Sequence, residues 1–131
     1  MYLNRLTIEQ KKAFLAIAMK IVGADRHLDP KERRTIEAMR VEMGLLTETD
    51  IPVGSIEELA KPFDNRQSQV IAMLEGIALA LVDEEFHGEE QKILRALALI
   101  FGFSEEEANA MENWVLNYKK LQTEAETMMS K

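Results

Sequence analysis

One short stretch occurs twice in this sequence and decides the expected fold. The first copy reads Ala24-Asp25-Arg26-His27-Leu28-Asp29-Pro30-Lys31-Glu32. The second begins 58 positions later and reads Val82-Asp83-Glu84-Glu85-Phe86-His87-Gly88-Glu89-Glu90. In each copy an apolar residue precedes an Asp, another apolar residue follows three positions after that Asp, and a Glu follows seven positions after it.

Both copies join two stretches with helical periodicity, and each second stretch ends in a glycine, Gly44 or Gly102. Comparison of residues 15–45 with residues 73–103 gives four identities, and the apolar positions between them also match. The identical pairs are Asp25/Asp83, Glu32/Glu90, Ala38/Ala96 and Gly44/Gly102. We therefore predict a duplicated helical hairpin packed about an approximate two-fold axis.

Helix starts are marked along the chain by capping residues. Thr7, Ser55 and Ser104 are each followed three positions later by Glu or Gln, which is the capping-box pattern. Pro30 fits the first position of a helix. Asp64 or Asn65 is expected to cap a long central helix to about Val82, whose stretch Ile77–Val82 is apolar on every side. A glycine inside that helix, Gly76, predicts close packing of a neighbouring helix.

The predicted fold is all-α, with six to seven helices and two pseudo-symmetric hairpins in one bundle-like domain spanning residues 1–131. The repeat halves cover about residues 8–45 and 66–103, and a C-terminal helix covers about residues 104–122. The first helix is expected to run to about Ala24 and to bury one face. Trp114 is assigned to the core, and Leu28 and Phe86 are expected to plug the core beneath their turns.

Composition excludes several classes of function. The chain has 131 residues, 47% of them apolar, a net charge of −7 and no cysteine. The acidic charge argues against nucleic-acid binding, and no apolar run is long enough to span a membrane. The absence of cysteine fits the reducing cytoplasm. The sequence also contains no Ser-His-Asp or Cys-His constellation that would indicate an enzyme.

The repeated acids are the one candidate site. Asp25 and Asp83 follow helix C-termini, where the helix dipole disfavours a carboxylate, whereas Glu32 and Glu90 begin the next helices. A hairpin brings each Asp near its Glu, and a divalent cation such as Ca²⁺ or Mg²⁺ accepts such oxygen ligands. The alternative is structural, since Glu32 also completes a capping box and neighbouring arginines can pair with Asp25.

The two turns differ in charge. Residues 25–34 carry three acids and four bases, whereas residues 83–92 carry five acids and one base. The second turn is therefore the stronger candidate for a cation.

These turns resemble those of the TerB-like family, helical domains named after a tellurite-resistance protein and found in some DnaJ-type co-chaperones. The match lies in Ala24-Asp25, Leu28 and Glu32, and again in Asp83, Phe86 and Glu90, with Arg26 and Glu84 where the family usually has glycine. The resemblance implies an all-helical domain with metal-binding acidic residues and a link to tellurite resistance or stress response. It implies no known reaction.

Two functional hypotheses follow. The first is a non-enzymatic, metal-responsive interaction module with Asp25, Glu32, Asp83 and Glu90 as ligands. The second is a metal-independent helical adaptor that binds a protein partner through a groove or through the irregular segment 45–63. The metal, the partner and the oligomeric state stay open at this point.

Overall fold

The computed structural model describes residues 1–23, 30–82 and 88–130, and in these ranges it is entirely helical. The elements are a short 3₁₀ helix η1 (Leu3–Arg5) and the α-helices α1 (Ile8–Ile21), α2 (Pro30–Met43), α3 (Ile56–Ala60), α4 (Arg66–Ala80), α5 (Gly88–Phe101) and α6 (Glu105–Met129). Six α-helices without a strand in the described ranges confirm the predicted all-α class. None of the helices there is long and apolar enough to cross a membrane.

The predicted helix starts are confirmed in atomic detail. The side chains of Thr7, Ser55 and Ser104 each accept a hydrogen bond from the backbone N–H three residues later, and each capping box is complete. Asn65 caps α4 by accepting from the N–H of Ser68 at 2.8 Å. These side chains satisfy backbone donors that have no partner within the helix, so each start is fixed by local sequence.

Helices α2 and α5 end in the same way. Gly44 and Gly102 adopt φ angles of 72° and 78°, a left-handed conformation that favours glycine. The N–H of Leu45 donates to the carbonyl of Arg40 at 2.7 Å, and the N–H of Phe103 donates to the carbonyl of Ala98 at 2.9 Å. Both pairs span five positions, as in a Schellman motif, so the duplicated glycines perform the same structural task in both hairpins.

The first helix is shorter than predicted. It ends at Ile21 instead of continuing to Ala24, because Gly23 takes a φ of 68° and breaks the helical path. The expected single buried face is also wrong, since every residue from Ala13 to Ala18 is buried. Helix α1 packs against α2, α3, α4 and α5, so neighbours cover it on several sides.

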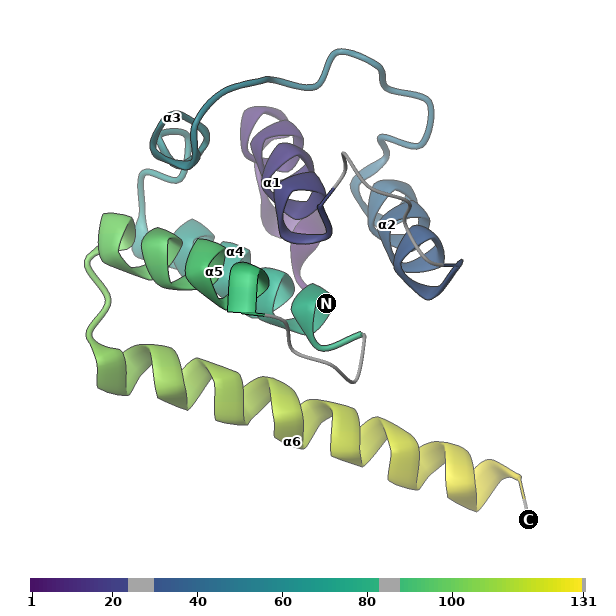
Figure 1. The fold of residues 1–131 in the computed structure, drawn as a ribbon. Coiled ribbons are helices and arrows are strands. Elements are labelled where there is room, and N and C mark those ends of the chain that lie inside the picture. The colour runs from purple at the N-terminus through teal and green to yellow at the C-terminus, as the bar shows by residue number, and fades with distance from the viewer. Residues whose placement is uncertain (24–29, 83–87, 131) are drawn as a thin grey trace.

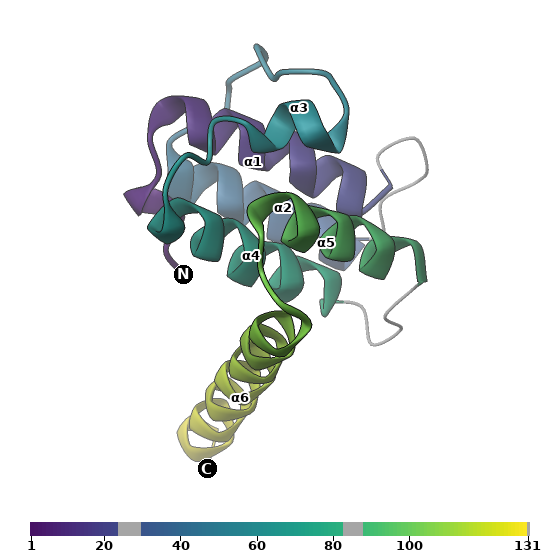
Figure 2. The same cartoon turned by 90° about the vertical axis from the view of Figure 1, so that its left-hand side faces the viewer.

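The helices form a body from which α6 extends. In Figure 1, α1 lies between α3 and α2, α4 and α5 lie beneath it, and α6 crosses below them and continues past the body. The view turned by 90° shows α6 leaving the body at one side (Figure 2). The core is centred on α1 and α4, and its fully buried side chains include Phe14, Leu15, Ile17, Met73, Leu79 and Leu97.

Gly76 confirms the predicted close approach of helices. A Cβ atom built there would lie 3.0 Å from Cδ2 of Leu94 and 3.3 Å from Cδ1 of Ile21. The α4 backbone is therefore in direct contact with side chains of α5 and α1. Since Ile21 is the last residue of α1, this contact also places the C-terminal half of α4 beside the C-terminal end of α1.

A buried carboxylate on α4 holds the N-terminal residues. Glu75 is only 2% exposed, and its Oε2 accepts hydrogen bonds from the Met1 ammonium and the Tyr2 N–H, both at 2.9 Å. Glu42 on α2 accepts from the Leu3 N–H at 3.1 Å and from the same ammonium at 3.3 Å. The ammonium is taken out of water, which lowers its pKa, but Glu75 and Glu42 raise that pKa, and the net shift is upward.

The assignment of Trp114 to the core is wrong. Trp114 is 40% exposed, and the neighbouring Val115 takes the buried position on α6. The Trp114 ring stacks on Tyr118, with centroids 5.5 Å apart, and its centroid lies 6.4 Å from that of Tyr2. Because α6 packs on the body along one edge only, a large ring one position from Val115 stays at the border of the contact.

Candidate functional site

The structure locates two of the four predicted metal ligands. Glu32 and Glu90 are the third residues of α2 and α5, so both lie in the first turn of the second helix of a hairpin, as predicted. Glu32 is half-buried, whereas Glu90 is 9% exposed. Asp25 and Asp83 lie outside the described residues, as do Leu28 and Phe86, and their assignments stay predictions.

The described residues alone do not form a metal centre. Among residues 1–23, 30–82 and 88–130, no group of three or more Asp, Glu or His side chains is placed to hold a metal ion. The predicted site therefore still depends on Asp25 and Asp83, which lie outside the described residues.

A cleft is present elsewhere, where α4, α5 and α6 meet. Its volume is about 460 Å³, within the usual range for ligand-binding pockets. The apolar floor is formed by side chains of the core, namely Met73 and Ile77 from α4 and Leu94 and Ala98 from α5. Ala108 of α6 adds a small side chain to the wall.

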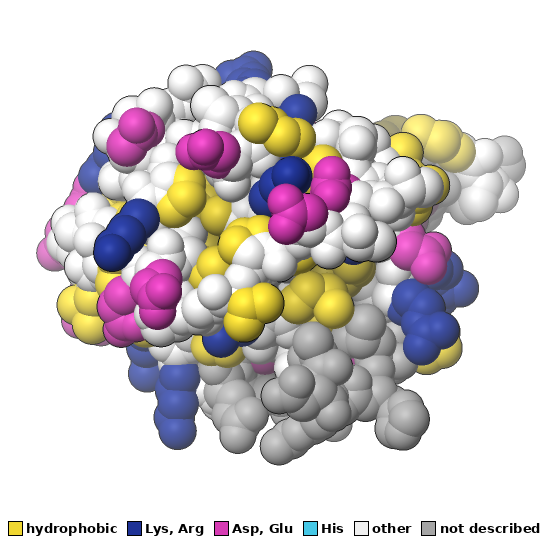
Figure 3. All heavy atoms as spheres, turned by 90° about the horizontal axis from the view of Figure 1, so that it is seen from above, with side chains coloured by type: hydrophobic (Ala, Val, Ile, Leu, Met, Phe, Trp, Pro, Cys, Tyr) yellow, Lys and Arg dark blue, Asp and Glu magenta, His cyan; other side chains and the backbone are white. Residues whose placement is uncertain are grey.

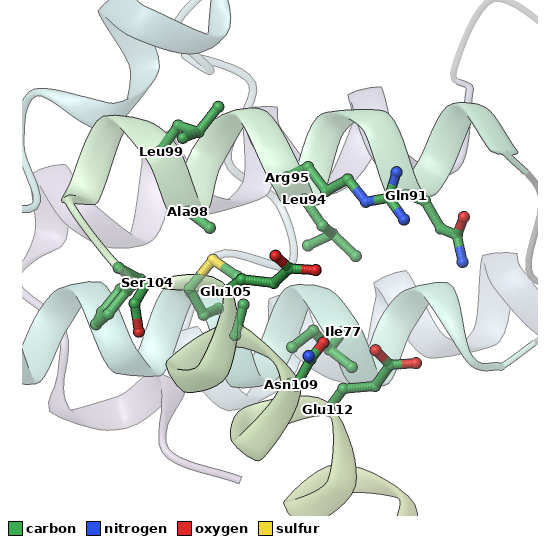
Figure 4. Close-up of a pocket in the computed structure, with 13 residues that line it drawn as sticks. Ile77, Gln91, Leu94, Arg95, Ala98, Leu99, Ser104, Glu105, Asn109 and Glu112 are labelled. Carbon is green, nitrogen blue, oxygen red and sulfur yellow. The ribbon is translucent and has the colours of Figure 1, made fainter.

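Charged side chains line the edges of this cleft. Arg95 and Gln91 stand along the α5 edge, and Asn109 and Glu112 stand on α6 (Figure 4). Glu105, also on α6, extends toward the α5 side of the opening (Figure 4). The lining thus has one base and two acids, which favours an apolar ligand bearing positive charge.

The side chains that line the cleft can contact a ligand, but they do not pair a nucleophile with an activating base. Ser104 is the one hydroxyl-bearing residue among the lining side chains, and its oxygen accepts the N–H of Glu107 at 3.1 Å. That bond caps α6, so the hydroxyl has a structural task. Neither His nor Cys is among the lining residues, so the cleft lacks the usual activating partner of a serine nucleophile.

Sequence reasoning did not find this cleft. Leu94 and Ala98 are buried apolar residues of α5, and the periodicity of the sequence did not indicate that α6 would cover them incompletely. Ala108 and Asn109 are short side chains at the crossing, and they do not fill the space above α5. The available signal for the cleft in the sequence was the pair of short side chains, Ala108 and Asn109, early in a capped amphipathic helix.

The face above α3 has a different character. Seen from above, its described part carries acidic and basic side chains interspersed with hydrophobic ones (Figure 3). Mixed charges of this kind are ordinary for a solvated surface. The α4–α5–α6 cleft is therefore the better-defined candidate site.

Comparison with known proteins adds no relative. No family model matches the chain, and no curated protein and no solved structure matches it either. The likeness to the TerB-like family is thus supported only at the level of a small all-α domain.

Proposed function

We propose that this protein is a non-catalytic helical interaction module of the TerB-like type, and that it binds its partner in the α4–α5–α6 cleft. The observation that carries this proposal is the cleft itself, with an apolar floor and charged edges. Such a groove suits an amphipathic peptide, which places apolar side chains on the floor and charged ones at the rim. The same proposal places the protein in the cytoplasm, in line with the absence of cysteine. It also gives the protein a role in stress or tellurite resistance, by resemblance to the TerB-like family.

The partner is expected to be a basic amphipathic helix. Its apolar side chains would contact Ile77 and Leu94, while Lys or Arg residues would lie near Glu105 and Glu112. The whole chain carries a net charge of −7, which speeds encounter with a basic segment.

The test is selection of random 16-residue peptides on the immobilised full chain, followed by fluorescence-anisotropy titration. Enriched peptides should carry apolar residues at helical spacing together with Lys or Arg. Ala108→Phe fills the cleft and should weaken binding at least tenfold, and Glu105→Lys should weaken it about threefold to tenfold, as for a rim charge. Matched controls are Ala110→Phe and Glu106→Lys, which change exposed residues of the same helix outside the lining.

Equal loss of affinity in the matched controls would assign binding to another surface. Failure of the selection to enrich any peptide with the expected spacing would contradict the proposed partner class.

A second candidate function is binding of a divalent cation at the acidic turns. It is favoured by the equivalent positions of Glu32 and Glu90, each the third residue of the second helix of its hairpin. Thermal melting with and without millimolar Ca²⁺, Mg²⁺, Mn²⁺ and Zn²⁺ tests it, because a bound ion stabilises the folded state. If no ion raises the melting temperature, these acids are capping and ion-pair residues and the cation proposal is wrong.

A further inference from the structure

Helix α6 forms one wall of the cleft while resting mainly on the floor helix. In the described part of the chain α6 packs mainly against α4, and α5 packs against α4 as well. Met111 of α6 packs against the core, and Val115 is fully buried. The separation between α5 and α6, and with it the width of the cleft, therefore depends on how α6 is fixed on α4.

Arg66, the first residue of α4, contacts the beginning of α6 in two ways. Its Nη2 atom pairs with Oε2 of Glu107, in the first turn of α6. The centre of its guanidinium group also lies 4.3 Å from the centroid of the Phe103 ring, which is a cation–π contact. Phe103 lies between α5 and α6 and is itself a lining residue of the cleft. Arg66 therefore holds both the junction of the two walls and the start of the α6 wall.

The two groups that Arg66 contacts are already held in place by other bonds. Oε1 of Glu107 accepts the N–H of Ser104 at 2.9 Å within the capping box. Phe103 is 6% exposed, and its ring packs edge-on against Phe101 with centroids 6.2 Å apart. The pKa of the Glu107 carboxyl lies below its ordinary value, first because of the Ser104 N–H and then because of Arg66. An isolated exposed ion pair stabilises little, but partners that are fixed beforehand lose less freedom when they pair.

We propose that Arg66 is a positioning residue that holds the α6 wall of the cleft at a fixed separation from α5, through Glu107 and Phe103. This role rests on the proposed function, because that wall belongs to the proposed partner site. Neither Arg66 nor Glu107 lines the cleft, so each acts on a ligand only through the placement of α6. A wall that is already in place need not be ordered when a peptide binds, which raises the affinity.

The first test measures the separation of the two walls without a ligand. The chain has no cysteine, so Lys92→Cys on α5 and Asn113→Cys on α6 allow two nitroxide labels at exposed positions outside the lining. Pulsed electron paramagnetic resonance should give a narrow distance distribution for the labelled chain and a broader one after Arg66→Ala. Glu107→Gln should also broaden it, because a glutamine still completes a capping box, as Gln10 does in α1, but carries no charge.

Matched controls remove the same groups from exposed positions elsewhere. Arg34→Ala on α2 and Glu106→Gln on α6 should leave the distance distribution unchanged. The double variant Arg66→Ala/Glu107→Gln should be no broader than Arg66→Ala, because both substitutions break the same contact. Circular dichroism and thermal melting check that every labelled variant is folded.

The second test measures the consequence for the partner site. Fluorescence anisotropy is recorded with a peptide selected on the wild type. Arg66→Ala should weaken binding about threefold to tenfold, and Glu107→Gln about threefold, because the α6 wall is then ordered only on binding. Arg34→Ala and Glu106→Gln should bind the peptide as the wild type does.

Three results would overturn the proposal. They are a distance distribution that Arg66→Ala leaves unchanged, an equal broadening by Arg34→Ala, and an unchanged peptide affinity despite a broadened distribution. A wild type that binds none of the selected peptides contradicts the proposed function instead. In that case the distance distributions alone decide whether Arg66 holds the α6 wall.

Discussion

The two hairpins end alike but are buried differently. Helices α2 and α5 both finish in a left-handed glycine followed by a buried apolar residue. Helix α5, however, packs against α1, α3 and α4, whereas α2 packs against α1 and η1. The comparison teaches that a repeated sequence fixes local chain geometry, while burial depends on which other elements cover each copy.

The difference extends to single equivalent positions of the repeat. Leu97 of α5 is 0% exposed and its counterpart Met39 of α2 is 8% exposed. Ile17 of α1 is a core hydrophobe, whereas its counterpart on α4 is Glu75, which holds the N-terminal ammonium. One hairpin therefore contributes apolar packing where the other contributes a buried charge.

The largest expected effect is the loss of stability on truncating a buried side chain of α5, compared with the equivalent side chain of α2. Leu97→Ala should lower the free energy of unfolding by about 3–4 kcal/mol, because Leu97 is 0% exposed and the lost side chain leaves a cavity. Met39→Ala should cost only about 2 kcal/mol, since α2 is open on one side and can relax. Urea denaturation measures both, with Leu99→Ala as a near-neutral control. Equal losses at positions 97 and 39 would remove the proposed asymmetry.

The next effect concerns the buried charge of the second hairpin. Glu75→Gln should destabilise the fold by about 1–3 kcal/mol, as expected for loss of a charge-assisted hydrogen bond. The Met1 ammonium has a pKa raised above its ordinary value of 8.0, so its pairing stabilises the fold fully below pH 8.0. That contribution is lost as the pH rises through the folded-state pKa.

The measurement is urea denaturation of wild type and Glu75→Gln between pH 7 and pH 10. Wild-type stability should fall over the upper part of this range, and the variant should show a weaker dependence. A variant with the wild-type pH profile would show that Glu75 does not set the ammonium pKa.

A smaller effect should be the same in both hairpins. Gly44→Ala and Gly102→Ala should each lower stability by about 1 kcal/mol, because alanine is strained at positive φ. No neighbouring atom lies within 4 Å of a Cβ at either position, so backbone strain alone produces the loss. Differential scanning calorimetry should show similar decreases in melting temperature, and a decrease at one glycine only would break the equivalence of the helix ends.

The smallest expected effect compares the acidic turns. If millimolar Ca²⁺ raises the melting temperature of the wild type, Asp83→Asn should reduce the shift more than Asp25→Asn, because the second turn has the larger excess of acids. The shift should disappear at acidic pH, where the carboxylates are protonated. Thermal melts of the three proteins give the answer, and an equal reduction by both substitutions would contradict the ranking.

Local signals in the sequence predicted much of the fold. The capping boxes at Thr7, Ser55 and Ser104 and the terminal glycines act within a few residues, so their geometry follows from the sequence. Gly76 was also informative, since a glycine inside a long apolar helix has few uses other than close packing.

Long-range contacts were not predictable in the same way. The pairing of Glu75 with Met1 joins residues far apart in the chain, and no local pattern marks it. Exposure of Trp114 and the cleft above Leu94 and Ala98 both depend on the path of α6 across the body. The candidate acids were found from their repetition, and the structure places Glu32 and Glu90 at equivalent helix starts.

The close approach at Gly76 has an evolutionary consequence. A methyl group there would press on Leu94 and Ile21, so a larger residue at position 76 requires these two side chains to shift or to become smaller. Relatives of this protein should keep glycine at the first position or combine a larger residue there with smaller ones at the other two. This linked set offers a criterion for recognising distant homologues that have lost the acidic repeat.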